Sequence, residues 1–277
     1  MTPVVSVIIP ACNEERHIGA CLKAVFASDP LPKHTLEAVV VANGCTDNTV
    51  AIAERFHSMA DPRGWRLRVL NLPKGSKISA LNEGDARAIG HIRVYLDADV
   101  VVSPSLLSEI TMALNTSRPR FATGTPSIQV PDDPLIAAYA RFWQSLPYTR
   151  MHAPGFGLFA VNTNGRARWG RFPNVIADDT FVRLQFTPDE RVQVPDTYAW
   201  PMVESLGRLI KVRRRQDQGT AQIAALYPEL LPNEGKPKPA LKPLIKADPF
   251  GFAVYGGVAA LVRATRGMNK GVWARGR

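Results

Sequence analysis

The stretch RVYLDADVVVSP, from Arg93 to Pro104, is an apolar run of β-prone residues that contains two carboxylates one residue apart. Because side chains alternate along a strand, Asp97 and Asp99 are expected on one face where the chain leaves the strand. Two close carboxylates repel each other unless a cation or a shared proton lies between them. Mg²⁺ or Mn²⁺ suits such oxygen ligands, above all when substrate phosphates complete its shell. An ordinary acidic strand end has the same pattern, so the surrounding sequence decides.

The first 100 residues repeat one arrangement, in which an apolar strand is followed by a polar loop and an amphipathic helix. Strands are expected at residues 4–10, 36–42, 65–72 and 93–97. This alternation predicts an α/β fold with a mostly parallel sheet flanked by helices. Polar clusters follow the strands at residues 11–15, 43–47, 74–77 and 97–99. Because the carboxyl ends of parallel strands meet at one edge of a sheet, the clusters predict a ligand site at that edge.

The composition is that of a globular protein, since 45% of the 277 residues are hydrophobic and 21% are charged. This length holds one large domain or two small ones. The cysteines, Cys12, Cys21 and Cys45, are too few and too scattered for a disulfide framework or a zinc site, so a reduced, cytoplasmic protein is expected. The first ten residues have no basic region before their apolar run and are expected to form a strand rather than a signal peptide.

The net charge of +10 comes from the C-terminal quarter of the chain. Residues 1–204 contain 20 Lys and Arg and 20 Asp and Glu, whereas residues 205–277 contain 14 and 4. A neutral body with a basic tail predicts that the tail meets an anionic partner, such as anionic lipid or a lipid-linked phosphate. No nucleic-acid-binding motif is visible in the sequence, so no nucleic acid partner is predicted.

Four motifs carry a resemblance to a known family. They are P-x-x-N-E-E at residues 10–15, N-G-C-T-D-N-T at 43–49, K-G-x-K-x-x-A-L-N-x-G at 74–84, and L-D-A-D at 96–99. In this order and spacing, the chain resembles the family 2 glycosyltransferases of the GT-A fold over residues 4–219. The resemblance implies a GT-A, Rossmann-like catalytic domain over residues 1–227, with a nucleotide-sugar-binding half at 1–100 and an acceptor half at 101–227.

The resemblance also implies a nucleotide-diphosphate sugar donor and a divalent cofactor, Mn²⁺ or Mg²⁺. Asp99 is then the direct metal ligand, while Asp97 faces the ribose or helps to hold the metal. The implied donor site consists of Pro10, Ala11, Asn13, Glu15, Asn43, Lys77, Asp97, Ala98 and Asp99. Lys77 is expected near the diphosphate or the base, with a solvated loop lysine as the alternative. Many relatives carry aspartate at the positions of Ala42 and Asn43, so a uracil base is not implied.

The second half of the resemblance provides a catalytic base. Gly155–Ala160 looks like the glycine-containing strand on the acceptor side of the family, and Gly170–Pro173 looks like the turn that follows it. Where the family has Glu-Asp, this chain has Asp178 and Asp179. An inverting transfer needs one carboxylate to take the proton of the acceptor hydroxyl. The resemblance assigns this role to Asp179, with Asp178 as the alternative, although such a pair also suits the N-cap of a helix.

Three further residues are candidates for binding the diphosphate or the acceptor, namely His152, Arg214 and Arg215. Arginines bind diphosphates bidentately, but a structural histidine and a solvated basic run are the alternatives. No glutamine lies three residues before Arg215, so a processive polymer synthase is not predicted. Trp143 and Trp169 are expected either to stack on a sugar ring or to pack in the core.

The C-terminal segment has two parts. Residues 228–249 are rich in proline and lysine, which predicts a linker or a lid. Residues 250–262 are apolar, but these 13 residues are too few to span a bilayer, which needs roughly 20. With the basic residues that follow, they predict a basic amphipathic helical segment over 250–277. It either lies on an anionic membrane surface or packs on the catalytic body.

Together these features predict an inverting, metal-dependent glycosyltransferase that acts on a hydroxyl acceptor, including a lipid-linked one or a precursor of surface polysaccharide. The enzyme is expected in the cytoplasm, either free or peripheral on the inner face of the membrane. A sugar nucleotidyltransferase is one alternative, but residues 11–15 lack the glycine-rich phosphate loop of such enzymes. The other is a non-catalytic module that binds a sugar or a membrane, and the paired carboxylates argue against it.

Overall fold

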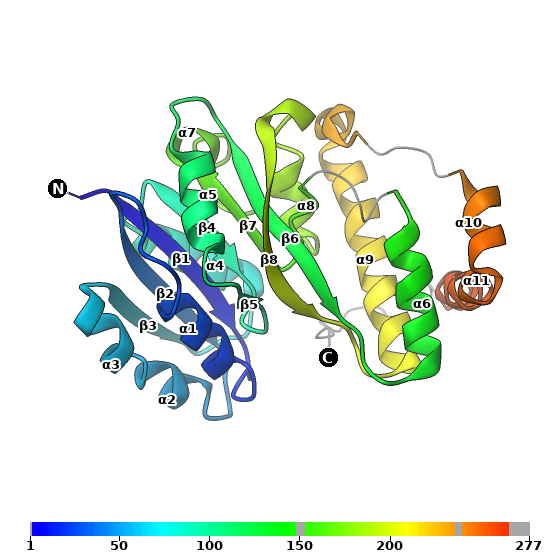
Figure 1. The fold of residues 1–277 in the computed structure, drawn as a ribbon, viewed down its shortest axis with the longest axis horizontal. Helices are drawn as coiled ribbons and strands as arrows, with labels where there is room; N and C mark the ends of the chain where they lie inside the picture. Colours follow the sequence, from blue (N-terminus) through cyan, green and yellow to red (C-terminus); the bar gives the residue numbers. More distant parts are fainter. Residues whose placement is uncertain (1, 148–152, 236–239, 266–277) are drawn as a thin grey trace.

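The computed structural model describes residues 2–147, 153–235 and 240–265. Within them, eight strands form one curled sheet with helices on both faces (Figure 1). The strands are β1 (Val4–Ala11), β2 (Thr35–Asn43), β3 (Arg66–Leu72), β4 (Ile92–Leu96), β5 (Val101–Val102), β6 (Phe121–Gln129), β7 (Leu158–Asn162) and β8 (Arg191–Pro201). The predicted α/β class is confirmed.

The helices alternate with the strands in the first half of the chain and dominate its last third. They are α1 (Ile18–Phe26), α2 (Thr49–Glu54), α3 (His57–Ala60), α4 (Lys77–Arg87), α5 (Leu106–Leu114), α6 (Pro134–Ser145), α7 (Thr163–Arg166), α8 (Asp178–Arg183), α9 (Leu206–Leu226), α10 (Leu241–Ala247) and α11 (Pro249–Ala264). Short 3-10 helices lie at Asp61–Arg63, Pro188–Glu190 and Pro228–Asn233. α2 and α3 are separated by a short break, and Phe56 in that break packs against the core.

The first half of the chain forms a parallel unit in the order β3-β2-β1-β4. β1 and β2 are buried along nearly their whole length because helices cover both of their faces. Val7 and Ile9 point into the cluster that holds the buried face of α1, whereas Ile8 points into the cluster that holds Leu81 of α4. The predicted strand–helix alternation over the first 100 residues is therefore confirmed.

β7 joins the two halves of the molecule. It pairs antiparallel with β4 on one side and with β6 on the other. β6 pairs in parallel with β8, and β8 pairs antiparallel with the two-residue β5. The start of β7 therefore lies beside the end of β4, which brings Gly157 next to Asp97, and the Asp97 N–H donates to the Gly157 carbonyl at 2.9 Å.

A separate apolar cluster joins the C-terminal helices. α6, α9 and α11 share it, and they lie with α10 at the end of the molecule opposite α2 and α3 (Figure 1). Val258 and Val262 of α11 are buried in this cluster, and Tyr255 stacks on Tyr139 of α6 with ring centroids 5.3 Å apart. The described part of the segment 250–277 thus packs on the body, as one of its two predicted alternatives required.

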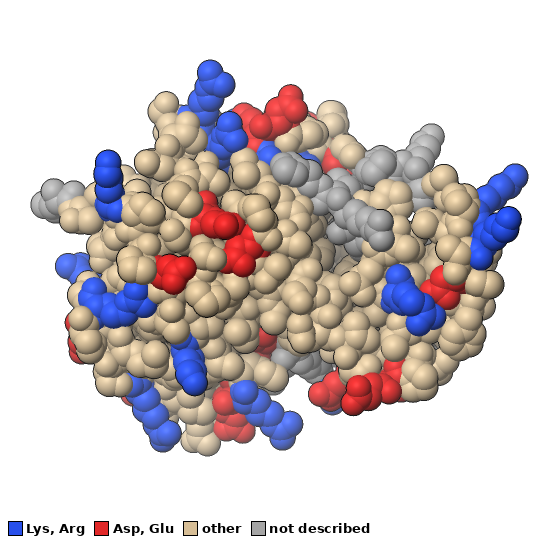
Figure 2. Space-filling view, viewed as in Figure 1, with Lys and Arg blue, Asp and Glu red and all other residues tan. Residues whose placement is uncertain are grey.

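The proline- and lysine-rich segment 228–249 contains a 3-10 helix at Pro228–Asn233 and the helix α10, while residues 236–239 lie outside the described ones. The expected linker or lid is therefore partly helical, and the predicted domain boundaries remain predictions. In the described part of the chain, no single helix is long and apolar enough to cross a membrane, although α10 and α11 together pass on length and composition with a bend of 118°. Figure 2 shows basic side chains at the end that carries α10.

Candidate active site

Two loops at the carboxyl edge of the sheet are tied together by the side chains of the first two motifs. The Asn13 amide accepts the Thr46 backbone N–H at 2.7 Å and donates to the Thr46 hydroxyl at 3.1 Å. The Glu15 carboxylate accepts from the Asn48 backbone and side-chain amides, each at 3.1 Å. Asn13 also has a φ of 54°, which asparagine tolerates better than most residues. These two predicted donor residues therefore shape the rim of the site.

Asn43 ties together three segments of the same rim. Its side chain is buried, its Nδ2 donates to the Ala11 carbonyl at 2.8 Å, and its Oδ1 accepts the Ser76 backbone N–H at 2.9 Å. The next residue, Gly44, has a φ of 61°, and a Cβ there would lie 2.5 Å from the backbone nitrogen of Gly75. Glycine is therefore required for this close approach of the two loops.

Lys77 connects the donor half with the acceptor half. It begins α4, whose N-cap Ser76 accepts the Ser79 backbone N–H at 3.2 Å. The Lys77 ammonium lies 3.0 Å from Asp97 Oδ1 and 3.2 Å from Asp178 Oδ2. Burial alone would lower the pKa of Lys77, but the Asp178 and Asp97 carboxylates raise it above its ordinary value. The alternative of a solvated loop lysine is therefore wrong, because a permanent cation lies between the two carboxylates.

The adjacent Asp178 and Asp179 differ in environment. Asp178 is 4% exposed, whereas Asp179 is half-buried. Burial and the neighbouring Asp179 and Asp97 charges raise the pKa of Asp178 to about 6, although the Lys77 ammonium opposes the shift. The Asp179 carboxylate accepts the Thr180 backbone N–H at 2.7 Å. The N-cap of α8 is Ala177, with no side-chain cap bond, so the N-capping alternative is wrong.

This group of charges lines a small cavity of about 30 Å³. It is lined by Pro10, Lys77, Leu81, Tyr95, Leu96, Asp97, Gly157, Phe159, Asp178 and Asp179. We call it the catalytic pocket. It brings predicted donor residues together with both candidates for the base, although these come from opposite halves of the chain. Leu81, Tyr95 and Phe159 were not predicted, yet Tyr95 lies two residues before Asp97 on a strand and Leu81 lies one helical turn after Lys77.

Asp97 and Asp99 lie in a turn rather than on the strand itself. β4 ends at Leu96, and the Asp97 carbonyl accepts the Val100 backbone N–H at 3.1 Å. The expectation that strand alternation continues to Asp99 is therefore wrong. The buried Cys21 thiol lies 3.9 Å from the Asp97 carbonyl. Its pKa is raised by burial first and then by the charges of Asp99 and Asp97. Asp97 lines the catalytic pocket, and Asp99 lies two residues further along the turn.

The metal ligands that this turn offers suit a divalent ion only when substrate phosphates supply further ligands. Among the described residues, no group of three His, Cys, Asp or Glu side chains could hold a metal. Mg²⁺ commonly keeps its waters and binds through one or two carboxylates plus substrate phosphates. The two carboxylates of Asp97 and Asp99, at the open end of a strand, fit that mode. They do not fit a metal site formed by protein side chains alone.

The remaining candidates lie elsewhere. Arg214 donates to the Thr265 hydroxyl at 2.6 Å, between α9 and α11, and neither it nor Arg215 lines the catalytic pocket. His152 lies outside the described residues. Trp143 and Trp169 are each 8% exposed and belong to apolar clusters, so both pack in the core rather than standing free to stack on a sugar.

A comparison with known families agrees with this geometry. Residues 6–169, more than half of the chain, match the family described as Glycosyl transferase family 2. The chain belongs to glycosyl transferase family 2. Among the curated relatives of this family 2 chain, glycosyltransferase AglE of Haloferax volcanii is 39% identical over 97 residues, which are 35% of this chain and 31% of the relative. The uncharacterized glycosyltransferase EpsJ of Bacillus subtilis is 32% identical over 114 residues, which are 40% of this chain and 30% of the relative. The match thus spans about a third of these relatives.

Solved structures confirm the GT-A fold of the family 2 chain. The mannosyltransferase PcManGT from Pyrobaculum calidifontis, in complex with GDP-Man and Mn²⁺, superposes with a TM-score of 0.62 at 22% identity, covering 98% of this chain and 77% of the other. S. aureus TarS 1–349 in complex with UDP-GlcNAc superposes with a TM-score of 0.56 at 17% identity, covering 96% of this chain and 74% of the other. Glucosyl-3-phosphoglycerate synthase from Mycobacterium tuberculosis, with Mg²⁺ and UDP, gives 0.52 at 22% identity, covering 80% and 79%.

Proposed function

We propose that this chain transfers a sugar from a nucleotide-diphosphate donor to a hydroxyl acceptor with inversion of configuration, and that Asp179 is the catalytic base. The observation that carries the proposal is the catalytic pocket, where the Lys77 ammonium lies between Asp97 and Asp178 and Asp179 lines the same cavity. A cation beside the donor carboxylates suits a substrate with two phosphates. A half-buried carboxylate next to it suits proton removal from an acceptor.

Each carboxylate in the pocket has a separate role in this proposal. Asp178 is buried against Lys77 and orients the ammonium. Asp179 is more exposed, and it accepts the proton of the acceptor hydroxyl as that oxygen attacks the anomeric carbon. Leu81, Tyr95 and Phe159 form the apolar lining, which limits the access of water to the reacting atoms.

Asp99 and Asp97 would hold Mn²⁺ or Mg²⁺ together with the donor diphosphate. When bound, the ion supplies positive charge that stabilises the diphosphate leaving group, so no separate general acid is needed. The support from relatives is that PcManGT was solved with GDP-Man and Mn²⁺, and the Mycobacterium tuberculosis synthase with Mg²⁺ and UDP. The residues of this chain contribute two carboxylates, and Lys77 fixes one of them.

The base of the donor is open between guanine, uracil and thymine. Asn43 occupies a position where many relatives carry aspartate, and both ends of its amide are bonded within the chain, to Ala11 and Ser76. We therefore expect the base to be recognised by the backbone of the rim loops rather than by this side chain. The neighbours bind GDP-Man in one case and UDP-GlcNAc in another, so they favour no single base.

For the acceptor, we propose a lipid-linked substrate at an anionic membrane surface. One curated relative, the dodecaprenyl-phosphate galacturonate synthase of Rhizobium johnstonii, carries a lipid phosphate in its name and is 27% identical over 110 residues. Three large apolar side chains, Leu241, Phe250 and Leu261, are 44%, 57% and 47% exposed on α10 and α11. Lys242 and Lys246 lie on α10 as well, so apolar and basic groups share this end of the molecule.

Release of nucleoside diphosphate from a panel of UDP-, GDP- and dTDP-sugars tests the function directly. The assay is run with Mn²⁺, with Mg²⁺ and with a chelator. We expect slow hydrolysis of one donor that requires the metal and yields a nucleoside diphosphate. Release of pyrophosphate from a sugar phosphate and a nucleoside triphosphate would instead identify a nucleotidyltransferase. If no donor is hydrolysed or bound in calorimetry, the chain is a non-catalytic module and the proposal fails.

A further inference from the structure

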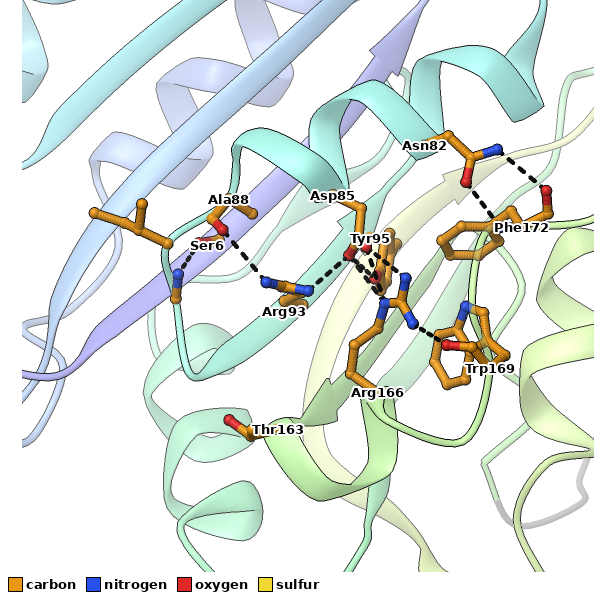
Figure 3. Close-up of polar contacts among 12 residues, drawn as sticks. Ser6, Asn82, Asp85, Ala88, Arg93, Tyr95, Thr163, Arg166, Trp169 and Phe172 are labelled. Atoms are coloured by element: carbon orange, nitrogen blue, oxygen red, sulfur yellow. Dashed lines mark hydrogen bonds and ion pairs between the residues drawn. The ribbon is translucent and has the colours of Figure 1, made fainter.

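A second cavity lies at the opposite edge of the sheet from the catalytic pocket. It has a volume of about 180 Å³ and is lined by Gly90, His91, Arg93, Thr163 and Arg166. Gly90 and His91 lie in the loop before β4, Arg93 lies near the start of β4, and Thr163 and Arg166 lie on α7, which follows the end of β7. These segments meet because Ile92 and Asn162 pair across the two antiparallel strands. We call this cavity the rear pocket, and Figure 3 shows the side chains of Arg93, Thr163 and Arg166 around it.

The rear pocket carries an excess of positive charge. Arg93 Nη1 lies 3.1 Å from Asp85 Oδ1, and Arg166 Nη2 lies 2.5 Å from Asp85 Oδ2 (Figure 3). Asp85 is 8% exposed, and burial alone would raise its pKa, but hydrogen bonds from Arg166 and Tyr95 and the charges of both arginines lower it. One ionised carboxylate therefore faces two guanidinium groups, and the trio keeps a net charge of about +1.

The two arginines differ in how many of their donors are used. Arg166 also donates to the carbonyls of Trp169 at 2.5 Å and Gly170 at 2.8 Å, so each nitrogen of its guanidinium makes a hydrogen bond within the protein. Among the residues that the structure describes, Arg93 donates only to Asp85 and, at 3.3 Å, to the Ala88 carbonyl. Its buried Nε has no hydrogen-bond partner among the described residues. A guanidinium has five N–H groups, and these two bonds use one hydrogen on each Nη. The second hydrogen of each Nη is left for a ligand, whereas the buried Nε is closed to one.

We propose that the rear pocket binds a phosphate-sized oxyanion, with Arg93 as its main donor and the exposed His91 at its mouth. The ion pair with Asp85 could by itself be structural, but Arg166 already bonds both oxygens of that carboxylate, so a second arginine is not needed to neutralise it. The cavity has room for about six waters, which suits a phosphate group with a short carbon chain. Inorganic phosphate and a soluble phosphomonoester are the two sources of this chemistry.

The rear pocket and the catalytic pocket have no lining residue in common, and Tyr95 and Asp85 lie between them. The Tyr95 hydroxyl donates to Asp85 Oδ1 at 2.6 Å, while the same residue lines the catalytic pocket. The proposed anion is therefore separate from the donor diphosphate, and its binding is expected to need no metal. This separation makes the site testable without knowing the donor.

Isothermal titration of the full chain with inorganic phosphate, in a chelator-containing buffer free of other oxyanions, tests the site. The same titration with glycerol 3-phosphate distinguishes the two sources, since tighter binding of the ester would identify a phosphomonoester site. Arg93→Gln is expected to weaken binding at least tenfold. Arg87→Gln is the matched control, because Arg87 is exposed at the end of α4, outside the rear pocket, and loses the same charge.

Two results would overturn the proposal: no saturable binding of either probe by the wild type, or equal affinity in the wild type and Arg93→Gln. Because Arg93 contacts a buried carboxylate, its variant can fail to fold, and a second readout avoids this risk. The His91 ring resonance, assigned in NMR spectra by its loss in His91→Gln, should shift during the phosphate titration of the wild type. A His91 resonance that stays fixed while phosphate binds would place the anion elsewhere and contradict the assignment.

Discussion

Asp178 and Asp179 are neighbours in sequence, but their surroundings assign them different tasks. Asp178 is buried against the Lys77 ammonium, and Asp179 is the more accessible of the two in the catalytic pocket. The sequence predicted Lys77 and Asp97 at one edge of the sheet, and the family resemblance gave Asp178 and Asp179 a catalytic role. The contact of this pair with Lys77 was not predicted. The sequence could not predict which carboxylate would be buried, because that depends on α4, about a hundred residues earlier in the chain.

Asp179→Asn is expected to lower transfer activity by about 10²–10⁴-fold, because amide nitrogen and oxygen cannot take the acceptor proton. The affinity for the donor should stay within about twofold of the wild type, since Asp179 acts on the acceptor. Turnover and donor titrations measure the two quantities separately. Asp189→Asn, an exposed aspartate in the 3-10 helix Pro188–Glu190, is the control. Full activity in Asp179→Asn would remove this residue from the role of base.

The pH dependence of stability should show the cost of burying the Asp178 carboxylate. Its folded pKa of about 6 is higher than that of an unfolded aspartate, so its stabilising contribution is present below about pH 4 and is lost as the pH rises through about 6. Asp178→Asn stays neutral at every pH. The difference in unfolding free energy between the variant and the wild type should therefore shift in favour of the variant by about 2–3 kcal/mol as the pH rises from about 4 to above 6. Urea unfolding of both proteins from pH 4 to pH 8 measures the difference, and a difference independent of pH would refute the shift.

At the scale of elements, the spacing of the side chains that α4 presents to β4 matches the spacing of side chains along β4. Lys77, Leu81 and Asp85 repeat every four residues along α4, which is a rise of about 6 Å. They face Asp97, Tyr95 and Arg93, which repeat every two residues along β4, a rise of about 6.6 Å. Lys77 pairs with Asp97 at one end of this interface, and Asp85 pairs with Arg93 at the other. The charges are thus opposite at the two ends, which fixes the direction and register of the helix on the strand.

Strand positions were predictable from the sequence because apolar β-branched runs bounded by polar loops indicate buried parallel strands. The hydrogen bonds of the rim loops were not predictable in the same way. Asn13 and Glu15 were expected to bind the donor, but their side chains bond to Thr46 and Asn48, more than thirty residues away. A polar motif looks the same in sequence whether it holds a ligand or a neighbouring loop.

The rim gives a prediction at this scale. In Asn43→Asp, the carboxylate can still accept from Ser76, but the hydrogen bond that Nδ2 donates to the Ala11 carbonyl becomes a contact between two oxygens. Because Asn43 is 1% exposed, we expect the free energy of unfolding to fall by about 1–3 kcal/mol. Urea unfolding at neutral pH measures the change. The exposed Asn174→Asp serves as the control, and equal stability of the two variants would show that the buried amide is not a structural tie.

At the scale of the whole molecule, the C-terminal helices both complete the fold and expose apolar side chains. α11 packs on α6 and α9, whereas Phe250 at its start is 57% exposed. The sequence left open whether this segment is packed or lies on a membrane. An amphipathic helix has two faces, so packing of one face does not exclude a membrane on the other.

The membrane proposal predicts that the chain sediments with vesicles that contain anionic lipid and much less with neutral vesicles. Phe250→Ser should reduce the bound fraction severalfold, because the exposed ring would otherwise enter the lipid interface. Met112→Ser is a matched control, since Met112 is also 57% exposed but lies on α5. Equal binding to both kinds of vesicle, or equal losses in the two variants, would show that α11 is not the contact. High salt should weaken binding if the basic residues contribute.

The strand order of the sheet has a consequence for the growing chain on the ribosome. β4 lies between β1, the first strand to be made, and β7, which is made about 60 residues after β4 ends. At about 5–20 residues per second, the outer edge of β4 waits several seconds for its partner. During that interval an apolar edge is open to any other strand. Arg93 lies within that edge and Asp97 directly after it, so two charged residues interrupt the apolar strand during this interval, which disfavours pairing with a foreign strand.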